Sequence, residues 1–487
     1  MNKLSLIKPY IKSEIFNECF ISSITDDSRD VQKNSLFIAR KGVSSHGKDH
    51  LRSAIKRGAS CIITSDKISK DLDIPIHHIS DLEDKIVEIL FSFHALSHDN
   101  FIFYGVTGTN GKTTTAFIAH NILRQLGRLS IYIGTLGAFI NDSLLKTKGN
   151  TTPGIFEIFE ILAKSNFNQK AYVFIEVSSH ALSQKRLCNL LFSKTIILNI
   201  QSDHLDYHKK EKNYIDAKLS IININNLSPT IVCIDELESL LSSFSNKQKA
   251  ILSKSNFLSS KDSNAKYNYL IDFNPQGLSK IELNFPDLKL ITYVESLLRF
   301  NIKNFISAIA LISDQISSEE LNKLQKNLIK LPAGRGEILE FDKGKILIDF
   351  AHDSQSMWNI LSELALSFNE IILVFGCGGD RDKSKRSKMM EVAQKFAKKI
   401  YFTSDNNRNE SFASIVSDAI AANHKRAFIK IIEDRKEAIS LGLEDLNKEN
   451  LLVILGKGHE DYIEISGKKI PFNDKKCVLK ILSHEID

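Results

Sequence analysis

The chain has 487 residues, of which 43% are hydrophobic and 25% are charged, a composition typical of a folded globular protein of about three domains. Its net charge of +6 comes from 64 basic and 58 acidic residues spread along the chain, and the lack of a basic block with interleaved aromatic residues argues against a nucleic-acid partner. Six well separated cysteines without a C-x-x-C pair, and no run approaching about 20 apolar residues, argue against a disulfide framework, a zinc site and a membrane span, and predict a cytoplasmic protein.

Short apolar runs alternate with helical patterns, which predicts an α/β protein whose mainly parallel sheets are covered by helices. Three blocks are predicted, comprising residues 1–97, 98–330 and 331–487. The second boundary is marked by Pro332 and two nearby glycines. The strands expected along the chain are 35–39, 60–65, 101–106, 172–177, 195–200, 345–350, 370–376, 399–404 and 451–456. Residues 242–261, rich in Ser, Lys and Asn, are predicted to be exposed and poorly specified surface.

The second block opens with a glycine-rich loop between a predicted strand and a predicted helix that ends at Gly127. Free N–H groups and the helix dipole favour phosphate at such a helix N-terminus. The loop is formed by Gly108, Thr109, Asn110 and Gly111. Lys112 is expected to contact the outer phosphates of a nucleotide, and the Thr113 hydroxyl to reach Mg²⁺. Val106 stands where the common G-x-x-x-x-G-K-[ST] pattern has its first glycine, so a simple glycine turn with an incidental lysine is the alternative.

Three polar residues follow in the same block. Glu176 ends one predicted strand and His204 lies just beyond the next, and the carboxyl ends of strands in an open α/β sheet form the usual ligand site. Each alone is more typical of a surface acid or a loop histidine, but their joint placement favours a shared site. Lys218 is by composition a surface lysine, yet as a CO₂-derived carbamate it would offer the oxygen ligands that Mg²⁺ prefers.

These motifs together resemble the Mur ligase family, ATP-dependent enzymes that add amino acids to the peptidoglycan precursor. In that family the phosphate loop reads G-T-N-G-K-[ST], so Val106 is no defect. The motifs that occur in the family's order are DSRDV (27–31), GTNGKTT (108–114), NTTP (150–153), EVSSHALSQKR (176–186), SDHLDYH (202–208), YIDAK (214–218), FNIKN (300–304), GRGE (334–337), DFAH (349–352), GCGGDRDKSKR (376–386), DNNR (405–408) and GKGHEDY (456–462). The resemblance covers nearly the whole chain.

The resemblance implies a UDP-binding α/β domain (1–97), a central P-loop ATPase domain with a mainly parallel sheet (98–330) and a C-terminal Rossmann-like α/β domain (331–487). It implies that Thr113 and Glu176 hold one Mg²⁺, and that His204 and carbamylated Lys218 serve a second. The implied ATP-binding residues are Gly108, Thr109, Asn110, Gly111, Lys112, Thr113, Thr114, Asn301, Asn304 and Asp349. Those implied for the UDP-linked substrate are Ser28, Asn150, Thr151, Thr152, Ser178, Gln184 and Arg186.

The third block is expected to read the incoming amino acid. In family members that add diaminopimelate the motif is D-N-P-R, and its arginine, matched here by Arg408, grips a carboxylate of the added residue together with an arginine matched by Arg335. A guanidinium makes planar bidentate contacts with a carboxylate that lysine cannot copy. The resemblance adds Gly456 and Glu460 at the distal amino end, and the motif itself contains Asp405, Asn406 and Asn407. Arg408 therefore favours meso-diaminopimelate over lysine.

Two departures from the family pattern bear on this expectation. Asn407 replaces the motif proline, so the loop loses a fixed φ and gains an N–H donor, which loosens the aim of Arg408. Asp353 and Ser354 replace the Thr-Pro that usually follows the D-F-A-H motif. The second change puts the local geometry on the nucleotide side in question, but not the class of reaction.

The resulting prediction is an ATP-dependent amide ligase that adds meso-diaminopimelate to UDP-N-acetylmuramoyl-L-alanyl-D-glutamate through an acyl phosphate, with two Mg²⁺ ions and a carbamate on Lys218. A monomer without a membrane partner is expected. A lysine-adding ligase, a folylpolyglutamate synthetase-like ligase and a non-catalytic nucleotide-binding homologue are the alternatives. The synthetase lacks the DSR, EVSSH…QKR and DNxR motifs, and intact Lys112, Glu176, His204 and Lys218 argue against a non-catalytic protein.

Overall fold

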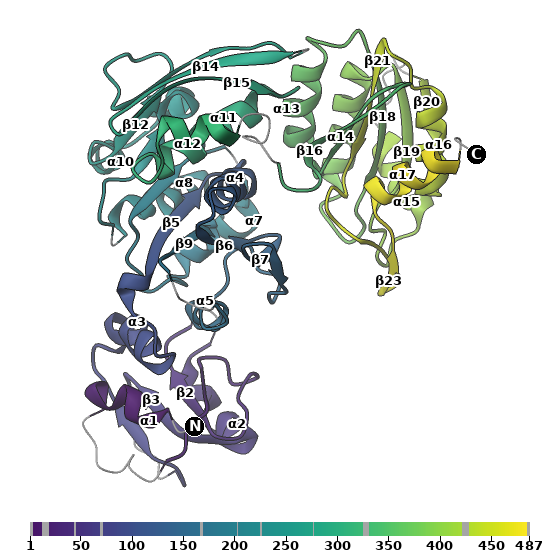
Figure 1. The fold of residues 1–487 in the computed structure, drawn as a ribbon. Coiled ribbons are helices and arrows are strands. Elements are labelled where there is room, and N and C mark those ends of the chain that lie inside the picture. Colours follow the sequence, from purple (N-terminus) through teal and green to yellow (C-terminus); the bar gives the residue numbers. More distant parts are fainter. Residues whose placement is uncertain are drawn as a thin grey trace. The chain divides into compact units, whose positions relative to one another are not determined.

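The structure, a computed structural model, describes residues 3–11, 19–42, 45–68, 72–165, 169–201, 203–224, 226–275, 277–324, 331–420 and 428–484. Its strands form three larger sheets, which helices accompany, and a small hairpin, as drawn in Figure 1. In the described part of the chain, no helix is both long enough and apolar enough to cross a bilayer.

The N-terminal sheet has four parallel strands in the order β1-β2-β3-β4. These strands are β1 (Ser23–Thr25), β2 (Ser35–Ala39), β3 (Ala59–Thr64) and β4 (Ile76–His78). The helices beside them are α1 (Leu4–Ile7), α2 (Leu51–Arg57) and α3 (Leu82–Phe93). Strand β2 is buried at all five positions, which explains why its sequence is a continuous apolar run rather than an alternating one.

The central sheet has eleven strands in the order β15-β14-β13-β12-β11-β10-β5-β9-β6-β7-β8. Parallel pairing joins the strands from β13 through β12, β11, β10, β5 and β9 to β6, and β7 and β8 continue antiparallel. The three strands that matter for the site are β5 (Phe101–Thr107), β9 (Ala171–Glu176) and β10 (Lys194–Ile197). Because β5 lies between β9 and β10, the loops that follow all three strands meet at one edge of the sheet.

The remaining strands of this sheet are β6 (Leu129–Gly134), β7 (Gly137–Ile140), β8 (Ser143–Leu145), β11 (Ile231–Cys233), β12 (Asn256–Ser259), β13 (Tyr267–Asp272), β14 (Leu278–Phe285) and β15 (Leu288–Glu295). The helices include α4 (Lys112–Gln125), α5 (Ile155–Leu162), α6 (Ser179–Ser183), α7 (Leu205–His208), α8 (Glu211–Leu219), α10 (Asn246–Leu252), α11 (Arg299–Ile312) and α12 (Ser318–Leu324). The predicted strand at 195–200 ends earlier in the structure, at Ile197, although the Leu198 N–H still donates to the Thr107 carbonyl at 2.9 Å and Leu198 and Ile200 are buried.

The prediction that residues 242–261 are exposed holds for many of them, including most of 242–250, but the prediction that they are poorly specified is wrong. The segment contains α10 and β12, and its residues Phe244, Leu252 and Leu258 are buried. Helix α10 begins with a capping box in which the Ser245 side chain accepts from the backbone N–H of Gln248, and the Gln248 side chain accepts from the backbone N–H of Ser245. This Ser-x-x-Gln spacing is a helix-start signal that the polar composition conceals.

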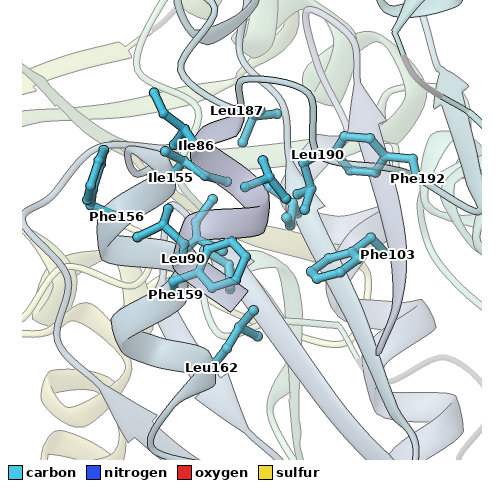
Figure 2. Packing of buried hydrophobic residues seen from close by; sticks show 14 of the residues in the cluster. Ile86, Leu90, Phe103, Ile155, Phe156, Phe159, Leu162, Leu187, Leu190 and Phe192 are labelled. Atoms are coloured by element: carbon cyan, nitrogen blue, oxygen red, sulfur yellow. The ribbon is translucent and has the colours of Figure 1, made fainter. Parts of the chain in front are cut away.

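The N-terminal sheet joins the central sheet through a shared hydrophobic cluster. Figure 2 shows Ile86 and Leu90 of α3 among Phe156 and Phe159 of α5 and Phe103 of β5. The rings of Phe91 and Phe159 meet edge to face, 4.7 Å between centroids. Burial of this many apolar side chains joins the first predicted block and residues 98–270 into one compact body, and the predicted boundary at residue 97 falls between α3 and β5.

The C-terminal sheet has six strands in the order β16-β17-β21-β18-β19-β20, with β16 antiparallel to β17 and the others parallel. Its strands are β16 (Arg335–Phe341), β17 (Gly344–Asp349), β18 (Glu370–Cys377), β19 (Lys399–Ser404), β20 (Phe428–Ile431) and β21 (Asn450–Leu455). A separate hairpin joins β22 (Tyr462–Ile465) and β23 (Lys468–Pro471).

Helices cover both faces of the C-terminal sheet (Figure 1). Helices α13 (Ser354–Leu364), α14 (Ser384–Phe396) and α15 (Phe412–Ile420) pack on one face, and α16 (Arg435–Glu444) and α17 (Asp474–His484) pack on the other. Alternate residues of one strand serve the two faces, as with Leu373 and Val374 of β18. This is the doubly wound architecture expected from the strand and helix alternation.

Contacts divide the chain into two compact units. The first comprises residues 1–270, 282–290 and 304–325, and the second comprises 271–281, 291–303 and 326–487. The predicted boundary at residue 330 lies outside the described residues. Each unit carries part of the candidate site.

Candidate active site

The phosphate loop has the conformation that its glycines suggest. Helix α4 begins at Lys112, and Gly111 before it adopts a left-handed φ of 85°. A side chain at Gly111 would bring its Cβ within 2.5 Å of the Asn304 side-chain oxygen, so glycine is required for two reasons. The Asn304 oxygen also accepts from the Thr115 hydroxyl at 3.4 Å. Asn304, one of the predicted ATP-binding residues, therefore lies directly beside the loop.

The segment after β10 holds the loop from the other side. The backbone N–H of Asn110 donates to the Asn199 side chain at 2.9 Å, and the Asn110 side chain donates to the Gln201 side chain at 3.0 Å. The Lys112 ammonium donates to the carbonyls of Gly108 and Thr109 at 2.8 and 2.9 Å, so the lysine lies over its own loop. Thr114 is buried on the first turn of α4. Asn199 and Gln201 escaped the sequence reading because amide residues in a loop carry no distinctive signal.

Glu176 is fully buried at the end of β9 and accepts hydrogen bonds from four groups. The Thr113 hydroxyl donates at 2.9 Å, the Thr135 N–H at 2.9 Å, the Thr135 hydroxyl at 3.2 Å, and the Tyr132 hydroxyl donates as well. A Cβ on Gly134 would collide with this carboxylate. The predicted pair Thr113 and Glu176 is thus in direct contact. Tyr132 and Thr135 come from the neighbouring strand β6 and its end, and pairing with β9 was not predictable from their sequence.

Lys218 and His204 lie on the other side of the phosphate loop. Lys218 is 1% exposed, and its ammonium lies 4.8 Å from the centre of the Tyr214 ring. Burial, with a contribution from the positive charge of Lys112, lowers the pKa of Lys218 well below that of an ordinary lysine, whereas Asp203 opposes this shift. The prediction that Lys218 is a surface lysine on composition alone is therefore wrong, and its amine is disposed to be neutral.

Tyr214 connects this lysine to the phosphate loop. Its hydroxyl lies 2.8 Å from the Thr109 hydroxyl, and burial raises its pKa above the usual tyrosine value. His204 begins α7 with a left-handed φ of 52°, and its ring nitrogen lies 3.4 Å from the Asp203 carboxylate. The His204 ring also lies 6.4 Å from that of Tyr214, centre to centre. Tyr214 belongs to the YIDAK motif, but only its lysine was singled out from the sequence.

In the described part of the chain, no group of three or more His, Cys, Asp or Glu side chains is placed to hold a metal ion. The donor set near the loop instead consists of the Thr113 hydroxyl and the Glu176 carboxylate, which are oxygen donors of the type that Mg²⁺ prefers. Mg²⁺ characteristically completes its ligand shell with water and substrate phosphates, so two protein oxygens fit it.

Five of the seven residues predicted for the UDP-linked substrate form one connected group. The Thr152 hydroxyl donates to the Glu176 carbonyl at 2.7 Å and lies 3.1 Å from the Ser178 hydroxyl. Arg186 donates to the Gln184 side chain at 2.7 Å and to the Thr152 carbonyl at 3.0 Å. The fifth member is Thr151, whose hydroxyl lies 3.3 Å from the Thr135 hydroxyl. This group therefore shares backbone and side-chain contacts with Glu176.

The other two predicted residues lie apart from that group. Asn150 is exposed just before Thr151, and Ser28 lies in the loop after β1. No hydrogen bond within the described ranges joins Ser28 to the connected group. Asp30, in the same loop as Ser28, forms an ion pair with Lys148, which places the two segments near each other.

In the second unit, the loops after β19 and β21 meet. Asn406 donates from its side chain to Glu460 at 2.9 Å, and Lys457, fully buried, donates to Glu460 at 2.9 Å and to the Asn406 side-chain oxygen at 3.2 Å. Gly456 adopts a φ of 113°, and its Cβ would come within 2.7 Å of the Asp405 carboxylate. The predicted set Asp405, Asn406, Gly456 and Glu460 is thus contiguous. Lys457 is a further member that sequence reasoning missed, although it lies inside the GKGHE motif.

Arg408 lies at the tip of the loop after β19. It adopts a left-handed φ of 50°, and its guanidinium donates to the Gly379 carbonyl at 2.6 Å. Asn407 is buried, with its side-chain nitrogen 3.4 Å from the Ser404 hydroxyl, and no residue that the structure describes donates a hydrogen bond to its side-chain oxygen. Glycine is required at 379 because a Cβ there would collide with the Asn407 carbonyl. The loop is therefore closely packed where the family proline is missing.

Arg335 and Asp349 face each other across β16 and β17. The Arg335 guanidinium lies 4.6 Å from the centre of the Phe350 ring, and its buried Nε has no hydrogen-bond partner among the described residues. Burial raises the pKa of Asp349, while Arg335 opposes the shift. Asn301 is buried beside Gly336, whose Cβ would lie 2.6 Å from the Asn301 side chain. The predicted ATP residues therefore divide, with Asn304 at the phosphate loop and Asn301 and Asp349 in the second unit.

The backbone just before Arg335 packs closely against the backbone of the GKGHE loop. A Cβ on Gly334 would collide with Gly458 and His459. Burial, with a contribution from Arg335, lowers the pKa of His459 to about 4, and within the described part of the chain its buried Nδ1 has no hydrogen-bond partner. The unpartnered nitrogens of Arg335 and His459 are the kind of buried polar atoms that a ligand satisfies.

The second departure from the family pattern has a local explanation. The Asp353 carboxylate accepts from the backbone N–H and the hydroxyl of Ser356, at 2.9 and 2.8 Å, and caps α13 at its N-terminus. An aspartate N-cap starts a helix as effectively as a proline at its first turn. The nucleotide-side geometry questioned at this point is therefore a regular helix start.

Comparison with known proteins matches three family models along the chain. These are the Mur ligase family catalytic domain at residues 20–88, the Mur ligase middle domain at 106–312 and the Mur ligase glutamate ligase domain at 334–458. A UDP-N-acetylmuramoyl-L-alanyl-D-glutamate–2,6-diaminopimelate ligase of Phocaeicola vulgatus is 30% identical over 494 residues, covering 99% of both chains.

The protein of the same name from Helicobacter hepaticus is 36% identical over 391 residues, which cover 78% of this chain and 81% of that relative. Among solved structures, one titled as a UDP-N-acetylmuramoyl-L-alanyl-D-glutamate–2,6-diaminopimelate ligase matches with a TM-score of 0.69 at 25% identity. That match covers 100% of this chain and 99% of the other.

Proposed function

Because the chain belongs to the Mur ligase family, we propose that it joins meso-diaminopimelate to the γ-carboxylate of the D-glutamyl residue in UDP-N-acetylmuramoyl-L-alanyl-D-glutamate. It is an ATP-dependent ligase that forms an amide bond, with ADP and phosphate as products. Within the Mur ligase family, this chain corresponds to the MurE ligases, which add diaminopimelate in peptidoglycan synthesis. The observation that carries this assignment is the whole-length similarity to ligases of that name.

The first step activates a carboxylate. The γ-carboxylate of the D-glutamyl residue attacks the γ-phosphorus of ATP, giving an acyl phosphate and ADP. Lys112 is the cation available to the phosphate oxygens, once its bonds to the Gly108 and Thr109 carbonyls are exchanged for bonds to phosphate. The N–H groups at the start of α4 and the dipole of that helix add positive potential at the same place.

Glu176 and Thr113 have the donor chemistry to hold Mg²⁺ next to the phosphates. Bound Mg²⁺ would supply positive charge against the negative charge that develops on the transferred phosphoryl group. Tyr132 and Thr135 fix the Glu176 carboxylate through hydrogen bonds, so its orientation is set before substrate binds. His204 and a carbamate on Lys218 would serve the second ion that the family resemblance implies.

A carbamate at Lys218 requires a neutral amine, because an ammonium has no free electron pair to attack CO₂. The burial of Lys218 and the proximity of Lys112, which lower its pKa, favour that neutral form. The neutral amine bonds to the carbon of CO₂ and gives up a proton to solvent, so the product is a carbamate anion that the positive charge of Lys112 would attract.

The second step forms the amide. The amine of diaminopimelate attacks the acyl carbon, and phosphate leaves from the tetrahedral intermediate. Arg408 and Arg335 are suited to grip the carboxylates of the incoming residue, while Glu460 is suited to the distal ammonium. Arg408 is the residue that distinguishes this assignment from a lysine-adding ligase, since lysine has no second carboxylate.

The connected group of Thr151, Thr152, Ser178, Gln184 and Arg186, with Asn150 and Ser28, is proposed to hold the UDP-linked substrate. Contact of this group with the Glu176 backbone would place the substrate carboxylate near the phosphate loop. We also propose that the protein is cytoplasmic, because the nucleotide substrates are cytoplasmic and six free cysteines suit a reducing compartment. We propose further that it is a monomer.

A ligation assay tests the assignment. Purified protein is incubated with ATP, Mg²⁺ and UDP-N-acetylmuramoyl-L-alanyl-D-glutamate, and with meso-, LL- or DD-diaminopimelate or lysine as the amine. With meso-diaminopimelate we expect phosphate release and an amide product. ATP hydrolysis should require both the UDP-linked substrate and the amine. Preference for lysine would contradict the role given to Arg408, and ATP hydrolysis without the UDP-linked substrate would contradict the ligase assignment itself.

A further inference from the structure

Two loops of the second unit, residues 378–382 after β18 and 405–410 after β19, are bonded to each other along their length. The Gly379 N–H donates to the Asn406 carbonyl at 2.9 Å, and the Arg408 guanidinium donates to the Gly379 carbonyl at 2.6 Å. The Asn409 side chain donates to the Asp380 carboxylate at 2.7 Å. The position of Arg408 therefore depends on the position of the neighbouring loop.

A single buried arginine lies beneath both loops. Arg386, on the first turn of α14, is 2% exposed. Its two terminal nitrogens donate to the two oxygens of Glu410, at 2.9 and 2.7 Å, in a bidentate pair. They also donate to the Gly378 carbonyl at 3.1 Å and to the Asp418 carboxylate of α15 at 2.7 Å. One side chain thus joins both loops and a covering helix.

Glu410 links Arg386 to the loop at residues 378–382. Its carboxylate accepts from the Asp380 backbone N–H at 2.6 Å, besides its bonds to Arg386. The hydrogen bonds from Arg386 lower the pKa of Glu410 to about 2, so the pair stays ionised under all physiological conditions. Bidentate pairs between a guanidinium and a carboxylate are directional, which makes them effective at fixing geometry as well as charge.

The backbone that Arg386 supports is strained. Arg408 and Asp380 both adopt left-handed φ values, 50° and 51°, although neither is glycine. Non-glycine residues in this conformation persist only where the surroundings impose it. Residue 407 is not proline, so no ring fixes the loop from within. The loop is held instead by the bonds through Arg386 and Glu410 and by the β22–β23 hairpin, where the Arg408 N–H donates to the Glu464 carbonyl at 2.9 Å and the Ser466 N–H donates to the Arg408 carbonyl at 2.6 Å.

We propose that Arg386 is a positioning residue for amino-acid selection, which holds the paired loops so that Arg408 presents its guanidinium to the distal carboxylate of the incoming amino acid. The inference rests on the proposed function for the identity of that amino acid, but the restraint on the loops does not. Arg386 itself touches no substrate in this scheme. Its loss weakens recognition of the carboxylate-bearing amino acid and leaves ATP and UDP-substrate recognition intact.

The test compares Arg386→Met and Arg386→Lys with the unaltered full-length enzyme. Arg386→Met is expected to raise KM for meso-diaminopimelate by on the order of 10- to 100-fold, with kcat and the KM values of ATP and the UDP-linked substrate unchanged. Arg386→Lys keeps the charge but loses the bidentate geometry, so it should recover part of the loss. The ratio of kcat/KM for diaminopimelate to kcat/KM for lysine should fall most in Arg386→Met and less in Arg386→Lys.

A second measurement needs no turnover. Hydrogen–deuterium exchange of the backbone amides of residues 378–382 and 405–410 should quicken in Arg386→Met and in Glu410→Gln. Glu370→Gln is the matched control, because it breaks an exposed ion pair with Lys398 at the opposite ends of the same two strands. Unchanged exchange in both loop variants would overturn the proposal. So would faster exchange with an unaltered KM for diaminopimelate, whereas failure of the unaltered enzyme to use diaminopimelate would refute the proposed function instead.

Discussion

Lys218 shows how the environment of a single residue changes its chemistry. The same side chain on the exposed face of α8 would be a permanent cation, but at 1% exposure and near Lys112 its ammonium form is disfavoured. A buried ammonium is costly unless the group is converted to something else. Reaction with CO₂ offers that conversion and at the same time supplies oxygen ligands.

We expect Lys218→Ala to reduce ligation by on the order of 10²- to 10³-fold, because a set of charges facing the phosphates is lost. Formate or acetate in the assay should restore part of the rate by supplying the missing carboxylate. In ¹³C-bicarbonate, the unaltered enzyme should give a carbamate NMR signal that Lys218→Ala lacks. Lys212→Ala, an exposed lysine of the same helix, is the control. Full activity of Lys218→Ala without added carboxylate would rule out the carbamate.

Asn407 permits a second test at the scale of one residue. The sequence suggested that losing the motif proline loosens Arg408, but the buried Asn407 makes only a long side-chain contact with Ser404, and the loop is held by other residues. We expect Asn407→Pro to leave the preference for diaminopimelate over lysine within about tenfold of its original value, which is less than 1.4 kcal/mol. Competition between the two amines in one ligation reaction measures this. A larger shift would show that residue 407 itself sets selectivity.

Strand ends are the elements on which the site depends. Arg435 of α16 is fully buried and donates to the carbonyls of Ser404 and Leu455, the last residues of β19 and β21. Its charge is paired bidentately with Asp474, at 2.7 and 2.8 Å. These two strand ends lead directly into Asp405 and Gly456. A helix on one face of the sheet thus fixes the starting points of two functional loops.

Asp474→Ala is expected to destabilise the second unit by about 3–5 kcal/mol, because it leaves the Arg435 charge buried without a partner. Urea unfolding of the full-length protein, followed by fluorescence and circular dichroism, measures the change. Glu370→Gln, which removes a solvent-exposed ion pair, should change little by comparison. Equal effects of the two substitutions would mean that the buried pair contributes no more than a surface one.

The elements that the sequence predicted well are those buried on both faces. The strands at 101–106, 370–376 and 399–404 each contain an uninterrupted apolar run of three or more residues, and the structure has β5, β18 and β19 there. Residues 242–261 were missed because short amphipathic elements bury only a few side chains each. Within the site, the phosphate loop and Glu176 followed from spacing and strand ends. Tyr132 and Arg386 did not, since their partners lie 44, 24 and 32 residues away.

At the scale of the whole molecule, the candidate residues are distributed between two compact units. The phosphate loop, Glu176, Lys218 and the group proposed for the UDP-linked substrate belong to the first unit. Every residue proposed to bind diaminopimelate belongs to the second. Each unit has its own hydrophobic core, so ligands of one unit should stabilise that unit in particular.

Scanning calorimetry of the full-length protein should therefore resolve two transitions. At about 100 times its Kd a ligand adds roughly 2.7 kcal/mol, which corresponds to a rise of roughly 5–10 °C for a unit of this size. We expect UDP-N-acetylmuramoyl-L-alanyl-D-glutamate to raise one transition and diaminopimelate the other. Arg408→Ala should abolish only the second shift. If diaminopimelate raised the same transition as the UDP-linked substrate, the assignment of its binding residues would be wrong.

The hydrophobic cluster between α3 and α5 limits how this chain can recombine with its relatives. Ile86 and Leu90 on one side, and Phe156 and Phe159 on the other, belong to blocks that look separable in sequence, yet they form one core. A chimera cut near residue 97 would join two surfaces that never evolved together and leave mismatched apolar side chains. A functional chimera should therefore exchange both blocks together. The amino-acid-binding block can then vary in evolution while the first two blocks are inherited as one module.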